Sequence, residues 1–546
     1  MNTESNRFRI WTPLLFSLVL TLGMILGFNL RDTLRNKQNI TSVIEHNPNL
    51  EEIIDLIKDK YVDTVNTDLL RKDAISGILQ RLDPHTVYIP ADELQNVNDD
   101  LEGSFFGIGV EFSIVRDTIA VISVIENGPA YHAGVEIGDQ LIKVGDTTVA
   151  GRNITSDGII HLLKGKRHSL VYVTFKRSSD GQLKQLPIVR DAIPIYSVDA
   201  GIMLDSITGF IKINRFSATT YDEFSRVMKV LVADGARQFV IDLRENPGGY
   251  LDAATSIADE FLDDNKLIVY TKGLHSPKVE YKAGERGAFE KDRLIVLVDE
   301  NSASASEILA GAVQDWDRGV IIGRRTFGKG LVQEQYDLDG GGALRLTVAK
   351  YYTPSGRCIQ RSFSNGKEAY EEDFEKRFES GALTRKDTMN VADTTHYYTS
   401  NHRAVYGGGG ITPDIYVPYD TTHFSTALLS VVFSEELKNT VWDYFIHNRK
   451  RLDFKDIKSF DISFADENNI AKAYFSSLKI PEHEKISLLL SKPGNMDYFK
   501  VHIKAQLARL LFRDNGYYSI ITKHDNVIDS ASHVLYSNEY SKIISR

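Results

Sequence analysis

Residues 293–307 read RLIVLVDENSASASE, a run of aliphatic residues followed at once by small polar ones. The aliphatic part is typical of a buried strand, and the Asn and Ser residues after it are good caps for a helix N-terminus. Ser304 would then stand between the end of a strand and the beginning of a helix. Functional side chains of α/β sheets lie at such strand ends. The stretch predicts an α/β sheet with a candidate nucleophile at its edge.

The alternation of strand and helix extends over residues 189–417. The expected strands and helices are GFIKI (209–213), YDEFSRVMKVLV (221–232), FVIDLR (239–244), DAATSIADEFL (252–262), LIVYT (267–271), RLIVLVD (293–299), SEILAGAVQDW (306–316) and GVIIG (319–323). This order is typical of right-handed β–α–β crossovers that cover a mainly parallel sheet. The strand at 239–244 is followed by Gly248 and Gly249, where the backbone can approach a ligand closely.

A serine hydroxyl is a poor nucleophile at neutral pH and needs a neighbouring base, usually His but sometimes a neutral Lys. Lys329, in TFGKGLVQ (326–333), is the obvious candidate for that base. Ser302 and Ser306 are rivals of Ser304, because a helix that begins near residue 304 points the three hydroxyls in different directions.

Residues 323–329 also satisfy the GxxxxGK pattern of a phosphate loop. Gly330, however, stands where Mg²⁺ binding requires Ser or Thr, and the following LVQEQYDL alternates like a strand. A phosphate loop must open a helix, so the pattern disfavours nucleotide binding.

Six ordered stretches between residues 82 and 415 resemble the C-terminal processing peptidases, also called tail-specific proteases. They are LDPHTVYI (82–89), GIGVEF (107–112), DLRENPGG (242–249), NSASASEILAGAVQD (301–315), TFGKGLVQ (326–333) and GGGITPDI (408–415). Members of this family are Ser/Lys endopeptidases with an inserted PDZ domain. The resemblance implies a mixed α/β fold, with a protease core of the ClpP/crotonase-like type.

The resemblance also assigns roles to single residues. It implies Ser304 as nucleophile, Lys329 as general base and Gln333 as the residue that holds the lysine. It implies the backbone N–H groups of Gly249 and Ala305 as the oxyanion hole, and the helix N-terminus at Ala305 would add favourable partial charge there. The intact set argues against the alternative of a non-catalytic PDZ scaffold.

Residues 101–186 show short strands, Gly-rich turns and one helix, SDGIIHLL (156–163), and GPAYHAG (128–134) completes a resemblance to PDZ domains. PDZ domains bind the last residues of a peptide as an added strand and hold the terminal carboxylate with loop N–H groups. The expected peptide-binding positions are Phe106, Gly107, Ile108, Gly109 and Val110 in the loop, with Ile159, Leu162 and Leu163 along the helix.

Residues 10–28 carry no charge and 13 of the 19 are apolar, which is long enough to span a bilayer. A cleaved signal peptide and a buried helix are the alternatives, but no small-x-small cleavage site follows. We expect an uncleaved single-pass anchor in the cytoplasmic membrane, with the catalytic region on the periplasmic side. The short leader and the family resemblance set this orientation.

Three further segments complete the predicted organisation. Residues 47–83 predict a helical hairpin that packs on the core or pairs protomers, 363–398 a charged surface insertion, and 420–546 helices without a recognisable motif. The predicted domains are an anchor (1–36), a helical segment (37–100), a PDZ domain (101–186), a peptidase core (187–419) and a mostly helical extension (420–546).

Composition limits the partners. The net charge of −10 is spread along 546 residues without a basic stripe, so nucleic acid is not expected. The single Cys358 permits no internal disulfide, and the 14 His residues form no metal motif, so we expect neither metal nor cofactor. A Ser-His-Asp protease would need a functional histidine, for which His85 and His275 are the candidates. The expected partners are proteins with free, apolar C-termini and, in a homodimer, a second copy.

Overall fold

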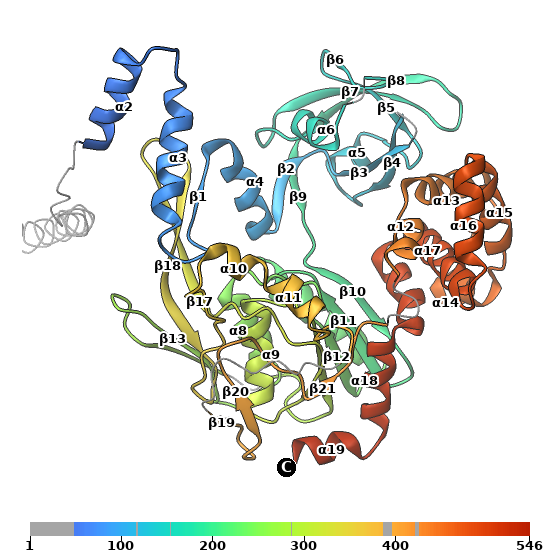
Figure 1. The fold of residues 1–546 in the computed structure, drawn as a ribbon. Helices are drawn as coiled ribbons and strands as arrows, with labels where there is room; N and C mark the ends of the chain where they lie inside the picture. The colour runs from blue at the N-terminus through green and yellow to red at the C-terminus, as the bar shows by residue number, and fades with distance from the viewer. Residues whose placement is uncertain are drawn as a thin grey trace, which may run out of the picture. The chain divides into compact units, whose positions relative to one another are not determined.

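The computed structural model describes residues 49–545, except 116–117, 153, 285–286, 386–395 and 421–424 (Figure 1). The chain divides into two units, Met1–Ile78 and Leu79–Arg546. The predicted anchor at 10–28 lies outside the described residues. Within the residues that are described, no helix combines the length and the apolar character needed to cross a bilayer.

The first unit contains the predicted helices on either side of a break at residues 61–66. They are α2 (Asn49–Lys60) and α3 (Thr67–Leu79). An ion pair between Arg71 and Glu51, with nitrogen and oxygen 3.3 Å apart, joins them. Both helices expose large apolar side chains, Leu50, Ile53, Leu56 and Leu69 among them.

The PDZ region contains the predicted short strands, which form an antiparallel sheet, and the predicted helix at 156–163, with a second short helix at 129–132 that was not predicted. Its strands, in spatial order, are β3 (Val110–Val115), β4 (Thr118–Val124), β5 (Gln140–Val144), β7 (Leu170–Lys176) and β8 (Leu183–Val189), with β6 (Thr147–Thr148) beside β5. Its helices are α5 (Pro129–His132) and α6 (Ser156–Leu163). The strands that enter and leave the domain, β2 (Ser104–Gly107) and β9 (Asp191–Pro194), pair antiparallel, which brings the two ends of the insertion together.

The core of the second unit is a six-stranded sheet, and it confirms the predicted mainly parallel arrangement. In order, the strands are β10 (Val198–Met203), β11 (Thr208–Ile213), β12 (Gln238–Asp242), β15 (Leu294–Val298), β16 (Val320–Gly323) and β21 (Ile415–Tyr416). All neighbours pair in parallel except β10, which is antiparallel to β11. Strands β12 and β15 are buried throughout, which explains their nearly continuous aliphatic sequences.

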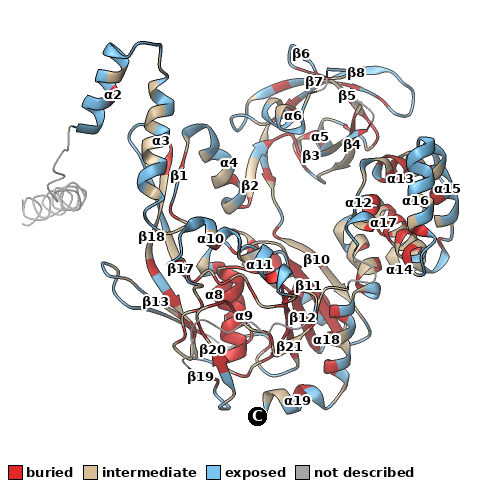
Figure 2. Ribbon diagram, in the orientation of Figure 1, coloured by how far each residue is buried: buried red, intermediate tan, exposed pale blue. Residues whose placement is uncertain are grey.

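Helices cover both faces of this sheet. On one face lie α7 (Thr220–Ala233), α8 (Leu251–Asp259) and α9 (Ala305–Asp315), and Figure 2 shows α9 buried along its length. On the other face, α18 (Asn526–Tyr536) and α19 (Glu539–Ile544) pack against alternate residues of the same strands (Figure 1). The end of the chain therefore completes the protease core.

A second, antiparallel sheet was not predicted. It contains β1 (Val87–Ile89), β18 (Ala343–Tyr352), β13 (Leu267–Lys272), β14 (Val279–Lys282) and β17 (Leu331–Asp337). The placement of residues 267–271 in the parallel sheet was wrong, since β13 pairs antiparallel with β14 and β18. Unlike β12 it is only partly buried, because Tyr270 and Lys272 reach towards solvent.

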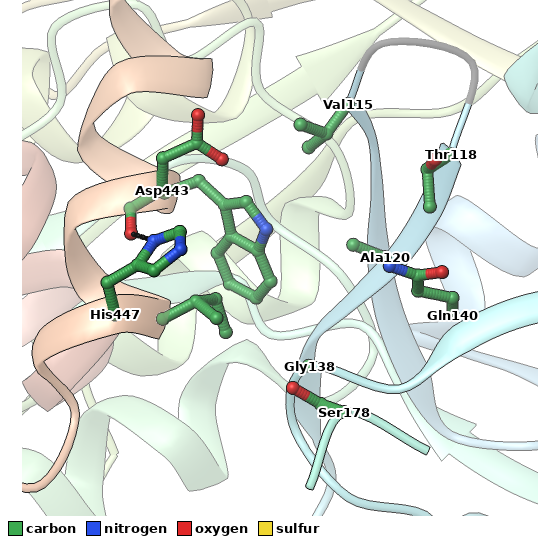
Figure 3. A pocket seen from close by; sticks show the side chains of 10 residues that line it. Val115, Thr118, Ala120, Gly138, Gln140, Ser178, Asp443 and His447 are labelled. Atoms are coloured by element: carbon green, nitrogen blue, oxygen red, sulfur yellow. Dashed lines mark hydrogen bonds between the residues drawn. The ribbon is translucent and has the colours of Figure 1, made fainter. Parts of the chain in front are cut away.

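The other helices of the extension form a separate lobe. They are α12 (Thr426–Val432), α13 (Glu435–Asn448), α14 (Ile457–Ser463), α15 (Glu467–Ser477), α16 (Ile480–Leu490) and α17 (Asn495–Ile521). Their core includes Val115 and Ala120 of the PDZ region. Beside this contact, a cavity of about 270 Å³ lies between α13 and the PDZ sheet, and Figure 3 shows Asp443 and His447 on its helical side. The lobe thus packs against the sheet of the PDZ domain.

Candidate active site

Ser304 occupies a tight turn between the end of β15 and the first residue of α9. Its backbone angles, φ 54° and ψ −113°, are costly for a residue with a side chain, by about 1–3 kcal/mol. Gly248 makes this turn possible, since a Cβ there would lie 2.8 Å from the Ser304 Cβ and 2.9 Å from the Ala305 nitrogen. The strain and the close packing single out Ser304 from its neighbours.

The carboxylate of Glu307 joins the Ser304 turn to the loop that carries Lys329. One oxygen accepts hydrogen bonds from the N–H groups of Ser304 and Lys329, both at 2.9 Å. The other accepts from the Thr326 hydroxyl at 2.5 Å and the Gly328 N–H at 2.8 Å. Burial raises the pKa of the Glu307 carboxyl, while the four donors favour its ionised form. One side chain thus fixes both loops.

A second side chain makes a similar connection. The Tyr351 hydroxyl lies 3.1 Å from the Ser304 carbonyl oxygen and 2.5 Å from that of Lys329. Tyr351 belongs to β18 and is buried. The structure therefore brings together the backbones of the two residues that the sequence predicted as nucleophile and base.

The Lys329 side chain points to Gln333, the third predicted residue. Its Nζ donates to Gln333 Oε1 at 2.9 Å, and Gln333 Nε2 donates to the His85 carbonyl oxygen. The pKa of Lys329 is lowered, mainly because the amine is buried and to a smaller extent because Arg345 carries a positive charge nearby. Among the residues that the structure describes, Lys329 Nζ has no ion-pair partner, and its hydrogen bond goes to an uncharged amide.

The predicted oxyanion donors lie beside this turn. The N–H of Gly248 is engaged by Asn246 Oδ1 at 2.9 Å. Gly249 forms a parallel bridge with Phe216, in which the Phe216 N–H donates to the Gly248 carbonyl oxygen and the Tyr250 N–H donates to the Phe216 carbonyl oxygen. The N–H of Gly249 takes no part in this bridge. Among the described parts of the chain, no acceptor meets the N–H of Gly249 or of Ala305. These two donors are therefore available to a ligand, and their role stays a prediction.

The predicted loop 106–110 runs from the last two residues of β2, Phe106 and Gly107, through a turn at Ile108 and Gly109, to Val110, the first residue of β3. Gly109 has φ 78°, and among the described strands β3 pairs with β4 alone. Ile108, Ile159 and Leu163 are packed in the domain core, whereas Val110 and Leu162 are partly buried. Phe106 is 39% exposed. The partly buried pair can contact a chain docked along β3.

Sequence reasoning missed several residues of the site. Glu307 stands three residues after Ser304 in an S-x-x-E pattern, which identifies a helix start and could have shown its bond to Ser304. Tyr351 carries no local pattern. His85 lies next to Lys329 and Gln333, whereas His275 is exposed between β13 and β14.

The chain is similar to known proteases. The sequence profile of Peptidase family S41 matches residues 207–367, and that of the PDZ domain matches 107–188. The carboxy-terminal-processing protease of Bartonella bacilliformis is 34% identical over 333 residues, 60% of this chain and 75% of the relative. The carboxy-terminal processing protease CtpA of Bacillus subtilis is 34% identical over 320 residues, 57% of this chain and 66% of the relative. A solved photosystem II D1 C-terminal processing protease is 25% identical, with a TM-score of 0.34, and the match covers 68% of this chain and 92% of that one.

Glu307→Gln is expected to destabilise the fold. The new amide nitrogen cannot accept a hydrogen bond, so two of the four donors around residue 307 lose their acceptor. Each unsatisfied buried group costs about 1–3 kcal/mol, so we expect the free energy of unfolding, measured with denaturant, to fall by roughly 2–6 kcal/mol. Glu93→Gln, on an exposed helix position, is the matched control. An unchanged unfolding midpoint for Glu307→Gln would contradict the role of this carboxylate.

Proposed function

The chain belongs to the carboxy-terminal-processing proteases of peptidase family S41, and from this premise we propose that Ser304, Lys329 and Gln333 form its catalytic centre. The protein is a serine protease with a PDZ domain. The observation that carries the assignment is the double connection by Glu307 and Tyr351, which holds the Ser304 turn beside the Lys329 loop.

In the proposed reaction, neutral Lys329 takes the Ser304 proton as Oγ attacks the carbonyl carbon of the scissile peptide bond. The N–H groups of Gly249 and Ala305 stabilise the resulting oxyanion. The Lys329 ammonium then protonates the leaving amine as the C–N bond breaks, which leaves an acyl ester on Ser304. A water molecule then attacks the ester carbonyl carbon and gives its proton to the same lysine. As the bond to Ser304 Oγ breaks, the Lys329 ammonium returns that proton to Oγ, which releases the second product as a carboxylic acid and restores the neutral lysine.

We propose that the PDZ domain captures substrates by a free, apolar C-terminus. The unpaired edge of β3 supports the addition of a peptide strand, and the turn at Gly109 supports binding of a carboxylate by the loop 106–110. Val110 and Leu162 offer partly buried apolar surface for the last side chains.

Two further proposals concern location and assembly. Residues 10–28 are an uncleaved anchor in the cytoplasmic membrane, with the catalytic region on the periplasmic side; their length and lack of charge support this. The exposed apolar side chains of α2 and α3 support pairing with a second copy of the chain.

Ser304→Ala and Lys329→Ala are each expected to lower turnover by at least about a thousandfold, because each removes one half of the same proton transfer. The double variant should lose no more than either single one. The measurement is mass-spectrometric detection of cleavage of an unstructured protein with an apolar C-terminus. Lys350→Ala, an exposed lysine on β18, serves as the control. Activity retained by either single variant would move the catalytic role elsewhere.

The pH profile should show a single ionisation. Lys329 is a base only when neutral, and burial lowers its pKa, so kcat/KM should rise with pH through a value below the ordinary lysine pKa of about 10.4. Gln333→Glu places a carboxylate beside Nζ, favours the ammonium form, and should shift the rise to higher pH. Rates between about pH 6 and about pH 10 test this, with Gln182→Glu, exposed in the PDZ region, as control. A flat profile contradicts the lysine mechanism.

Amidation of a substrate's C-terminus should weaken its binding about tenfold or more, because the loop 106–110 then has no carboxylate to hold. Binding is measured by titration of the full chain carrying Ser304→Ala, so that cleavage does not interfere. A peptide acetylated at its N-terminus is the control and should bind unchanged. Equal affinity for acid and amide would remove the carboxylate from the recognition.

A further inference from the structure

Lys329 is linked by hydrogen bonds to a helix of the charged insertion. Lys329 Nζ donates to Gln333 Oε1, and Gln333 Nε2 donates to the His85 carbonyl. The Nε2 atom of the His85 ring is in turn hydrogen-bonded to the Tyr370 hydroxyl at 2.8 Å. Tyr370 belongs to α10 (Lys367–Glu371). The links connect segments that are far apart in the sequence.

The His85 carbonyl decides which way the Gln333 amide points. A carbonyl oxygen can only accept, so the amide nitrogen of Gln333 must face His85 and its oxygen must face Lys329. A neutral lysine has two N–H bonds and one lone pair. Donation of one N–H to Gln333 leaves the lone pair free for a proton, whereas a reversed amide would donate into that lone pair. The His85 carbonyl thus keeps Lys329 competent as a base.

His85 is itself held at both its backbone and its ring. Asp83 accepts from the His85 N–H at 2.9 Å and from the Thr86 hydroxyl at 2.6 Å, which fixes the turn. The ring lies edge-on against Tyr370, with centroids 5.4 Å apart, and against Phe327, at 6.2 Å. Burial, followed by the charge of Lys329, lowers the pKa of His85 to about 4, so the ring is neutral at physiological pH.

Tyr370 is buried and packs against the guanidinium group of Arg361. The Arg361 guanidinium lies 3.7 Å from the Tyr370 ring centroid and 4.1 Å from that of Phe327, in cation–π geometry. Arg361 is paired with Asp373 at 2.6 Å. Tyr370 is only 5% exposed. The hydroxyl that contacts His85 therefore has little freedom to move.

The next helix, α11 (Asp373–Glu379), holds the loop that leads to Lys329. The buried Arg377 pairs with Asp373 at 2.8 Å and donates to the Thr326 carbonyl at 3.0 Å. The insertion thus makes two contacts near the base: Arg377 binds the lysine loop at Thr326, and Tyr370 binds His85, whose carbonyl orients Gln333.

We infer that His85 and Tyr370 are positioning residues for the lysine base, and that α10 and α11 form a strap that keeps Lys329 and Gln333 aligned. This rests on the roles proposed above for Lys329 and Gln333. Because His85 and Tyr370 act through Gln333, their loss should lower the rate of the chemical step and leave substrate binding unchanged.

The test begins with Tyr370→Phe in the full chain, which keeps the ring packing and removes only the hydroxyl. A net contribution typical of one hydrogen bond predicts a fall in kcat of about threefold to tenfold, with KM unchanged. His85→Ala should act in the same direction. Tyr398→Phe makes the same chemical change at an exposed tyrosine of the insertion and should have no effect.

The deciding measurement repeats Tyr370→Phe in a Gln333→Ala background. If Tyr370 acts through Gln333, it causes no further loss there. An additive loss, a change in KM instead of kcat, or a loss that merely follows the folded fraction seen by circular dichroism would overturn the inference and leave the proposed catalytic centre intact. Full activity of Gln333→Ala itself would instead overturn the role proposed for Gln333 and the inference with it.

Discussion

A single buried carboxylate, Glu307, holds the active site together. Removing an ionised carboxylate from water is costly unless hydrogen bonds replace the lost hydration. Here the carboxylate receives four, and three of the donors are backbone N–H groups, of Ser304, Gly328 and Lys329. The contact therefore fixes the course of the main chain at both loops. Hydrogen bonds to an ionised acceptor are also stronger than neutral ones, which helps to stabilise the strained turn at Ser304.

The same geometry turns the oxygens of Glu307 away from the lysine amine, so that its charge raises the Lys329 pKa by less than burial lowers it. Had Glu307 faced Lys329 Nζ, an ion pair would have favoured the ammonium form, in which lysine is no base. Its oxygens instead face backbone donors and a hydroxyl, and the amine meets the uncharged amide of Gln333. Burial is consequently the main influence on the Lys329 pKa, and it acts downwards. Structural support and a lowered pKa come from one arrangement of groups.

Local sequence patterns predicted the parts of the fold whose burial is uniform. The aliphatic runs of β12 and β15 and the small residues after β15 were enough to predict a parallel sheet with Ser304 at its edge. They could not assign β13, because a half-buried strand fits either sheet and its partner, β18, lies far along the chain. The packing of α18 on the far face of the sheet was not predicted for a similar reason. Periodicity indicates a helix and its apolar stripe, but it does not indicate which surface that stripe covers.

In the candidate site too, the sequence predicted the residues that stand in local motifs and missed the contacts between distant segments. Ser304, Lys329 and Gln333 stand in short motifs, whereas the contact between His85 and Tyr370 joins residues 285 positions apart and leaves no local trace. The nucleophile follows β15 of the parallel sheet, and the base lies in the loop that leads from β16 of that sheet to β17 of the antiparallel one. The distance between them therefore depends on how the two sheets are joined. Glu307 and Tyr351 join the backbones, and the strap orients the base. The Ser304 hydroxyl turns by rotation about a single bond, Cα–Cβ, and that rotation sets its direction relative to the Lys329 amine while both backbones stay fixed.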